Sequence, residues 1–115
     1  MGGNENEPNK ADKVQKADEI LHYQAGSIVS KVLLKNKGGT VTLFAFSKGE
    51  ALSEHTAPFD ALVQIIQGEA DVSIAYDRFQ VREGEIIKLP ANIPHAIGAT
   101  SDFKMLLTMI RESIT

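Results

Sequence analysis

The sequence lacks cysteine altogether. That absence excludes a disulfide scaffold, a thiolate metal site and a cysteine nucleophile, and it suits a reducing compartment. A long hydrophobic run is lacking as well, because the longest, at 103–110, is interrupted by Lys104 and is far too short to cross a bilayer. Residues 1–13 have no apolar core of the kind that a secretory signal carries. We therefore expect a cytoplasmic protein.

An excess of positive charge is also absent. The 12 Lys and Arg residues against 15 Asp and Glu residues give a net charge of −3, so we expect neither nucleic acid nor a membrane surface as a partner. No nucleophile elbow is present, and Gly38-Gly39 lacks the helix that follows a phosphate-binding loop. With 115 residues, 43% of them hydrophobic, the chain is expected to form one soluble domain.

Short segments rich in β-branched and aromatic residues recur at nearly regular spacing, separated by Gly, Pro, Asn and Asp. They lie at 27–34, 41–47, 62–67, 70–76, 79–82, 86–89, 95–99 and 103–111. The tight turn between the fourth and fifth is expected near Asp77-Arg78, which would make them a hairpin. Eight or nine short strands without a long helix predict an all-β sandwich or barrel.

The N-terminal residues and the last apolar segment each allow a separate prediction. Residues 1–13 are polar and charged, so we predict a disordered lead there and a folded domain at 14–115. Residues 17–23 are compatible with one short N-terminal helix. The segment 103–111 is apolar on both faces and is expected to be central. Its second apolar face suggests contact with a partner subunit, so we expect a homodimer.

Two stretches of the chain resemble the paired motifs of small single-domain cupins, the RmlC-like family. In the first motif, Gly49, His55 and Gly68 fall on the family register, whereas Ala57 and Ala61 stand where a histidine and a glutamate are usual. In the second, Gly84, Pro90 and His95 match; Asn92 replaces a glycine and Ala99 an asparagine. Six of ten anchor positions therefore agree. The resemblance implies a double-stranded β-helix, or jelly-roll barrel, over residues 27–111.

The resemblance also implies a site at the mouth of the barrel. Members of the family hold a divalent Fe, Mn, Ni, Zn or Cu ion there, and His55 and His95 occupy two of its ligand positions. Ala57 and Ala61 cannot coordinate a metal, and catalytic sites usually keep three protein ligands. Because Ala61 faces inward in the family register, we expect Asp60 and Gln64 to face outward and not to replace it.

Three functions stay open at this point. The ligand count favours a small-molecule-binding cupin with a degenerate metal site. The alternatives are a metal-dependent dioxygenase or isomerase and a non-catalytic regulatory or interaction module. His22 is expected to be an ordinary polar side chain. A pocket beside the histidine pair would be lined by four further residues, although ordinary barrel core is the more common role of such side chains. They are Phe44, Phe46, Met105 and Met109.

Overall fold

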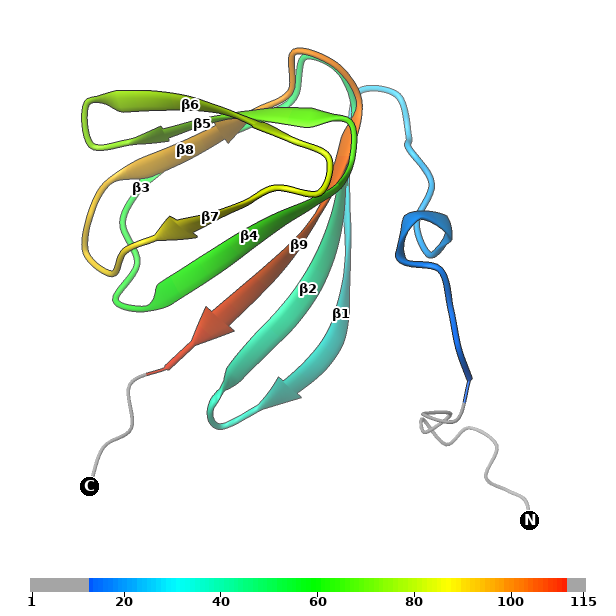
Figure 1. Cartoon of the computed structure of the whole chain (residues 1–115), viewed down its shortest axis with the longest axis horizontal. Helices are drawn as coiled ribbons and strands as arrows, with labels where there is room; N and C mark the ends of the chain where they lie inside the picture. The colour runs from blue at the N-terminus through cyan, green and yellow to red at the C-terminus, as the bar shows by residue number, and fades with distance from the viewer. Residues whose placement is uncertain (1–12, 112–115) are drawn as a thin grey trace.

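Residues 13–111 are described by a computed structural model, and they form nine β-strands in two antiparallel sheets (Figure 1). The five-stranded sheet has the order β1 (Ile28–Asn36), β2 (Gly39–Phe46), β9 (Phe103–Ile110), β4 (Asp60–Gln67) and β7 (Ile86–Leu89). The four-stranded sheet has the order β3 (Ala51–His55), β8 (His95–Gly98), β5 (Glu69–Ile74) and β6 (Asp77–Arg82). The predicted jelly-roll barrel is confirmed, with β9 central as expected. No helix in the described part of the chain is long and apolar enough to span a membrane.

The alternation of side chains along the strands decides which of them fill the barrel. On β4, Val63 and Ile65 are fully buried, whereas Gln64 between them is exposed. Val63 pairs with Leu107 of β9, and Ile65 pairs with Met105. Since successive side chains point to opposite faces of a strand, this register places one apolar set inside. Phe46 and Phe103 stack in that interior with ring centroids 4.5 Å apart.

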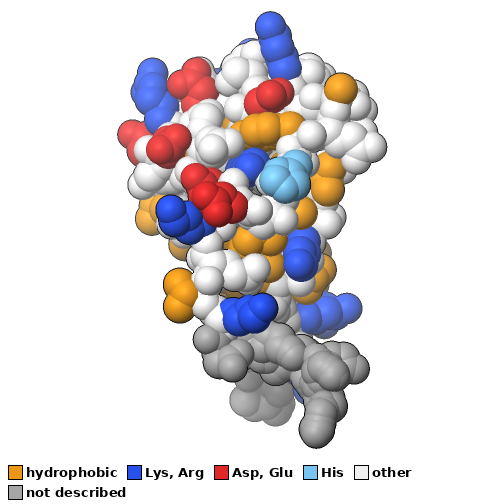
Figure 2. Space-filling view, turned by 90° about the vertical axis from the view of Figure 1, so that its right-hand side faces the viewer, with side chains coloured by type: hydrophobic (Ala, Val, Ile, Leu, Met, Phe, Trp, Pro, Cys, Tyr) orange, Lys and Arg blue, Asp and Glu red, His pale blue; other side chains and the backbone are white. Residues whose placement is uncertain are grey.

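A second, smaller core lies on the outer face of the five-stranded sheet. There the N-terminal segment (residues 13–27) crosses the strands, and its Leu21 packs with Leu43 and Ala45 of β2. The phenol of Tyr23 donates a hydrogen bond to Gln67 Oε1 at 2.6 Å. Figure 2 views the side of the molecule that carries this segment and shows hydrophobic side chains among charges of both signs. Part of the second apolar face of β9 is thus covered within the chain, since Leu106 packs against this cluster.

The amino group of Lys104, on β9, holds the N-terminal segment against the outer face of the sheet. Lys104 is buried on the outer face of β9, and its Nζ donates to the backbone carbonyl of Asp18 at 2.6 Å. The same Nζ lies 4.9 Å from the centroid of the Tyr23 ring, a cation–π distance. A buried ammonium needs such partners, because desolvation without them is costly.

The structure refines one local prediction and corrects two. The short N-terminal helix is a single 3₁₀ turn, Ala17–Glu19. The predicted strands did not include β3 (Ala51–His55), which ends at His55. The turn of the β5–β6 hairpin lies at Ala75-Tyr76, two residues before the expected place, with Ala75 at φ 55°. Most of the predicted disordered lead, residues 1–12, lies outside the described residues.

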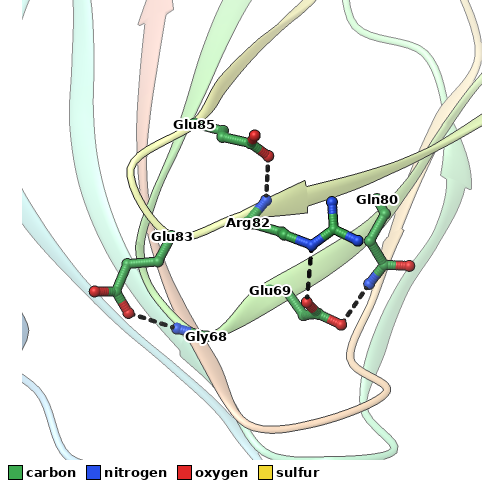
Figure 3. A network of polar contacts seen from close by, with 6 residues as sticks. All are labelled: Gly68, Glu69, Gln80, Arg82, Glu83 and Glu85. Carbon is green, nitrogen blue, oxygen red and sulfur yellow. Dashed lines mark hydrogen bonds and ion pairs between the residues drawn. The ribbon is translucent and has the colours of Figure 1, made fainter.

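Polar contacts join the two strands of the β5–β6 hairpin and link Gly68, just before it, to the turn that follows it (Figure 3). The carboxylate of Glu69 accepts a hydrogen bond from Gln80 at 2.8 Å and lies 3.6 Å from Arg82 Nε. Glu83 accepts the backbone N–H of Gly68 at 3.4 Å. Gly68 has φ 78°, a left-handed conformation that glycine adopts without strain, so the first-motif glycine is required by the sharp link between β4 and β5.

Candidate functional site

The two motif histidines face each other across two neighbouring strands. His55 ends β3, His95 begins β8, and the antiparallel register makes them direct partners. Their ring centroids are 4.5 Å apart, with an angle of 68° between the ring planes. His95 is buried and His55 is exposed. The structure therefore brings together two residues that are forty positions apart in the sequence, as the motif spacing implied.

Backbone hydrogen bonds fix the tautomer of both rings. His55 Nδ1 lies 2.9 Å from the carbonyl oxygen of Ser53, and His95 Nδ1 lies 3.2 Å from that of Ile93. A carbonyl oxygen can only accept, so each Nδ1 carries the hydrogen and donates it. In the neutral rings each Nε2 then keeps a free lone pair. The pair thus offers two nitrogen acceptors for a hydrogen-bond donor or a metal ion.

The environment of His95 favours its neutral form. Burial lowers the pKa of His95 below its usual range, since a charged ring loses hydration there. The hydrogen bond to the Ile93 carbonyl acts in the opposite direction, and the charge of His55 lowers the pKa further. The net result is a ring that accepts hydrogen bonds near neutral pH instead of carrying a charge.

The strand ends around the pair define the mouth of the barrel. The inner row of the five-stranded sheet at this end consists of Thr40, Met109, Ala61 and Leu89, which are paired in that order across β2, β9, β4 and β7. Ala61 is half-buried and packs against the inner core. The inward orientation that the family register gives position 61 is therefore correct, and the side chain there is a methyl group.

Neither neighbour in sequence replaces the missing carboxylate. Gln64 is exposed, and so is Asp60, whose Oδ1 accepts the backbone N–H of Ala91 at 2.9 Å. Asp60 therefore holds the connector between β7 and β8. In the same connector Asn92 has φ 64° and donates its N–H to the carbonyl of Ala57 at 2.7 Å. Asparagine tolerates this left-handed conformation, which explains how it can stand at a glycine position.

The residues at the mouth do not make a complete metal centre. Among residues 13–111, no group of three or more His, Asp or Glu side chains is placed so that it could hold a metal ion. His55 and His95 fit two ligand positions, and Ala57 and Ala61 add none. Two imidazoles leave most of the coordination shell to water or to a ligand, so any ion there would be weakly held.

The other predicted pocket residues lie at different depths. Phe46 and Met105 have no accessible surface and belong to the core beneath the site, and Phe44 is half-buried against it. Met109 instead lines a pocket of about 260 Å³ beside the β1–β2 turn. His22 is exposed on the N-terminal segment. That these residues line a ligand pocket with the histidines stays a prediction.

One polar position at the mouth was missed by reasoning from the sequence. Thr40 shares the inner face of β2 with Phe44 and pairs with Met109. Strand alternation could have found it, because Thr40, Thr42, Phe44 and Phe46 have the same parity. The turn signal of Gly38-Gly39 hid it, since β2 was expected to begin only at residue 41.

Comparison with known proteins agrees with this architecture. The model of the cupin domain family matches residues 42–111. A conserved protein of unknown function from Streptococcus pyogenes is 31% identical, with a TM-score of 0.85 and 90% of each chain covered. A Cupin 2 conserved barrel domain protein from Leptotrichia buccalis is 44% identical over 82% of this chain and 46% of that chain, with a TM-score of 0.79. A cupin superfamily protein from Desulfitobacterium hafniense is 25% identical, with a TM-score of 0.84 and coverage of 88% of this chain and 93% of that one.

The fold, the two motifs and the family match agree, and the chain belongs to the cupin family. A comparison with curated proteins gave no match. The family therefore establishes a small barrel of the kind that binds small molecules or metal ions. The particular ligand has to be argued from the site.

Proposed function

We propose that this cupin binds a small polar molecule at the mouth of its barrel, and that His55 and His95 receive it at a degenerate metal site. The observation that supports this most directly is the pair of rings whose Nδ1 atoms are engaged by backbone carbonyls. Each neutral ring is left with an Nε2 acceptor, and no third ionisable ligand in the described residues joins them. An O–H or N–H group of the ligand would satisfy these acceptors.

The two imidazole rings would have different roles in binding the ligand. His95 is buried and its lowered pKa keeps it neutral, so it is suited to accept a hydrogen bond from the ligand. His55 is exposed and can be approached from solvent. The aliphatic and aromatic side chains of the inner faces, Phe44 among them, would contact the apolar part of the ligand. Binding of this kind needs no metal ion.

Metal-dependent chemistry of the dioxygenase or isomerase type is the second candidate. It is favoured by one feature, the convergence of two imidazoles, which are good ligands for Fe, Mn, Ni, Zn and Cu. A bound ion would supply a Lewis acid, and His55 and His95 would hold it with water or substrate in the remaining positions. A regulatory or interaction module without catalysis is the third. The cytoplasmic location and the homodimer expected from the sequence also remain proposals.

Metal content separates the first two candidates. The protein is purified without added metal, incubated with Fe, Mn, Ni or Zn, desalted and analysed for bound metal. We expect far less than one ion per chain. One tightly held ion per chain that disappears in His95→Ala but persists in His22→Ala would refute the degenerate site and favour the metal enzyme. His22 is a suitable control because it is exposed on the N-terminal segment.

Ligand binding is tested independently by thermal shift with a library of small polar metabolites. A ligand that binds only the folded state raises the melting temperature by mass action. We expect at least one such compound to stabilise the wild type and His22→Ala but not His95→Ala. If no compound acts, or if His95→Ala responds like the wild type, the proposed role of the histidine pair is wrong.

A further inference from the structure

Arg111 lies at the mouth of the barrel, directly after the last residue of β9. Its backbone N–H donates to the carbonyl of Gly38 at 2.8 Å, so the pairing of β9 with the start of β2 continues through this residue. Side chains alternate along a strand, and Arg111 therefore has the parity of Met109, which belongs to the inner row. Figure 1 shows the end of β9, the start of β4 and the link from β7 to β8 at the same end of the barrel.

The ring of Phe59 positions the Arg111 side chain. Phe59 comes one residue before β4, and it stands opposite Arg111 because the last pair of the β4–β9 ladder is Asp60 with Ile110. The guanidinium carbon Cζ lies 5.5 Å from the centroid of this half-buried ring, a cation–π distance. Stacking uses the face of a guanidinium and leaves the N–H groups at its edge available to an acceptor.

Within residues 13–111, no carboxylate pairs with Arg111. The ion pairs of these residues both lie on the β5–β6 hairpin. Asp60 and Arg111 line the same cavity of about 180 Å³, but Asp60 Oδ1 accepts the N–H of Ala91 at 2.9 Å. Many exposed arginines are merely hydrated, whereas Arg111 is stacked on an aromatic ring and faces a cavity. It therefore offers a positioned cation to a ligand at the mouth.

We propose that Arg111 determines the specificity of the barrel mouth, and that the ligand is a small carboxylate that also carries a hydroxyl group. The carboxylate would bind the edge of the Arg111 guanidinium, because the two planar groups match in a two-point hydrogen bond. The hydroxyl would donate to a free Nε2 of His55 or His95, whose Nδ1 atoms are engaged by carbonyls. This inference rests on the proposed function, since it needs the histidine pair as the second contact.

The size of the barrel limits the ligand to a short molecule. Packed sheets lie about 10 Å apart, so a long arginine side chain and a ligand of a few carbon atoms together span that distance. The histidine pair belongs to the four-stranded sheet and Arg111 follows the central strand of the other. A hydroxy acid with its two polar groups at opposite ends meets both requirements.

The test compares hydroxy acids with their neutral amides. Glycolate, lactate, glycerate and the amide of each are titrated into the full chain, and dissociation constants are obtained from amide chemical shifts by NMR. We expect at least one acid to bind about 10-fold or more tightly than its amide, because its hydrogen bond to Arg111 is charge-assisted. In Arg111→Gln this preference should disappear, with the affinity for the amide unchanged. Phe59→Leu keeps the charge and removes the ring, so it should weaken binding of the acid by about 3-fold.

Arg82→Gln is the matched control for the loss of one positive charge. Arg82 is exposed on β6 and pairs with Glu69, whereas Ile74, at the other end of β5, pairs with His95. We expect Arg82→Gln to bind the acids and the amides like the wild type. Spectra recorded without ligand show whether each variant is folded.

The outcomes separate this inference from the proposed function. If acids and amides bind equally well and both lose affinity in His95→Ala, the histidine site stands and the role of Arg111 is overturned. If the preference for acids depends on Arg111 but His95→Ala binds them like the wild type, the shared site is wrong. If none of the hydroxy acids binds, the ligand class is wrong.

Discussion

Replacing Gly68 with alanine tests whether close packing, and not only backbone angle, fixes the first cupin motif. Gly68 and Gly84 are both motif glycines, with φ 78° and 86°. A Cβ at Gly84 would meet nothing within 4 Å, whereas a Cβ at Gly68 would lie 2.4 Å from the carbonyl oxygen of Asp102. The same Cβ would also lie 3.0 Å from the Cβ of Phe103. The two substitutions therefore share one penalty and differ in the other.

The expected magnitudes follow from these distances. A left-handed conformation costs an L-residue roughly 1–2 kcal/mol, and Gly84→Ala should lose about that much stability. At Gly68 the chain must also move by about 1 Å to relieve the contact, and overpacking of this kind costs about 1–3 kcal/mol more. Phe103 cannot yield easily, because it is fully buried and stacked on Phe46. Gly68→Ala should thus lose roughly 2–5 kcal/mol in total.

Urea unfolding at equilibrium measures both values. We expect the midpoint to fall in both variants and to fall further in Gly68→Ala, with similar slopes for all three proteins. Gly26→Ala is a further control, because Gly26 has φ 72° and open space around it. If Gly84→Ala and Gly26→Ala are as damaging as Gly68→Ala, the contact with Asp102 is unimportant. The backbone angle alone would then explain the glycine.

Three further predictions concern the site and the N-terminal segment. Because the pKa of His95 is lowered in the folded protein, the unfolded chain takes up the proton at higher pH. The free energy of unfolding should therefore fall as pH drops from about 6.5 through that depressed pKa, and His95→Gln should flatten this fall. Restoring the family ligands with Ala57→His and Ala61→Glu should make the melting temperature rise with added Zn²⁺ or Ni²⁺, and an unchanged melting temperature would contradict the geometry assigned to Ala61. Lys104→Met should cost about 2 kcal/mol and speed hydrogen exchange in residues 16–24, because the charged hydrogen bond to that segment is lost; unchanged exchange would show that Lys104 does not hold it.

Much of the fold was predictable because its signals are local. The inward position of Ala61 in the family register, carried along the strand by alternation, indicates that Val63 and Ile65 face the interior, and both are buried. Gly68 and Gly84 were expected at turns between strands, and in the structure both have a positive φ. The central position of β9 followed from its apolar faces. Each of these inferences uses only nearby residues or the spacing of a motif, and neither needs coordinates.

The errors arose where a distant contact decides the local structure. Ala75 adopts φ 55° although alanine gives no turn signal, and its N–H donates to the carbonyl of Pro94 at 2.8 Å. That bond comes from a segment nearly twenty residues away, so the position of the hairpin turn could not be found locally. The strand that ends at His55 was missed for the same reason, because it exists through its pairing with β8.

The sequence by itself determined that this chain is a cupin barrel with histidines at two motif positions and alanines at two others. Tertiary structure decided what those residues can do. It pairs His55 with His95, engages both Nδ1 atoms with backbone carbonyls and buries one ring, which lowers the pKa of His95. It also covers Leu43 and Ala45 on the outer face with Leu21 and leaves Leu34 and Leu62 of that face exposed. Burial and approach distance depend on the whole fold, and no pattern of neighbouring residues contains them.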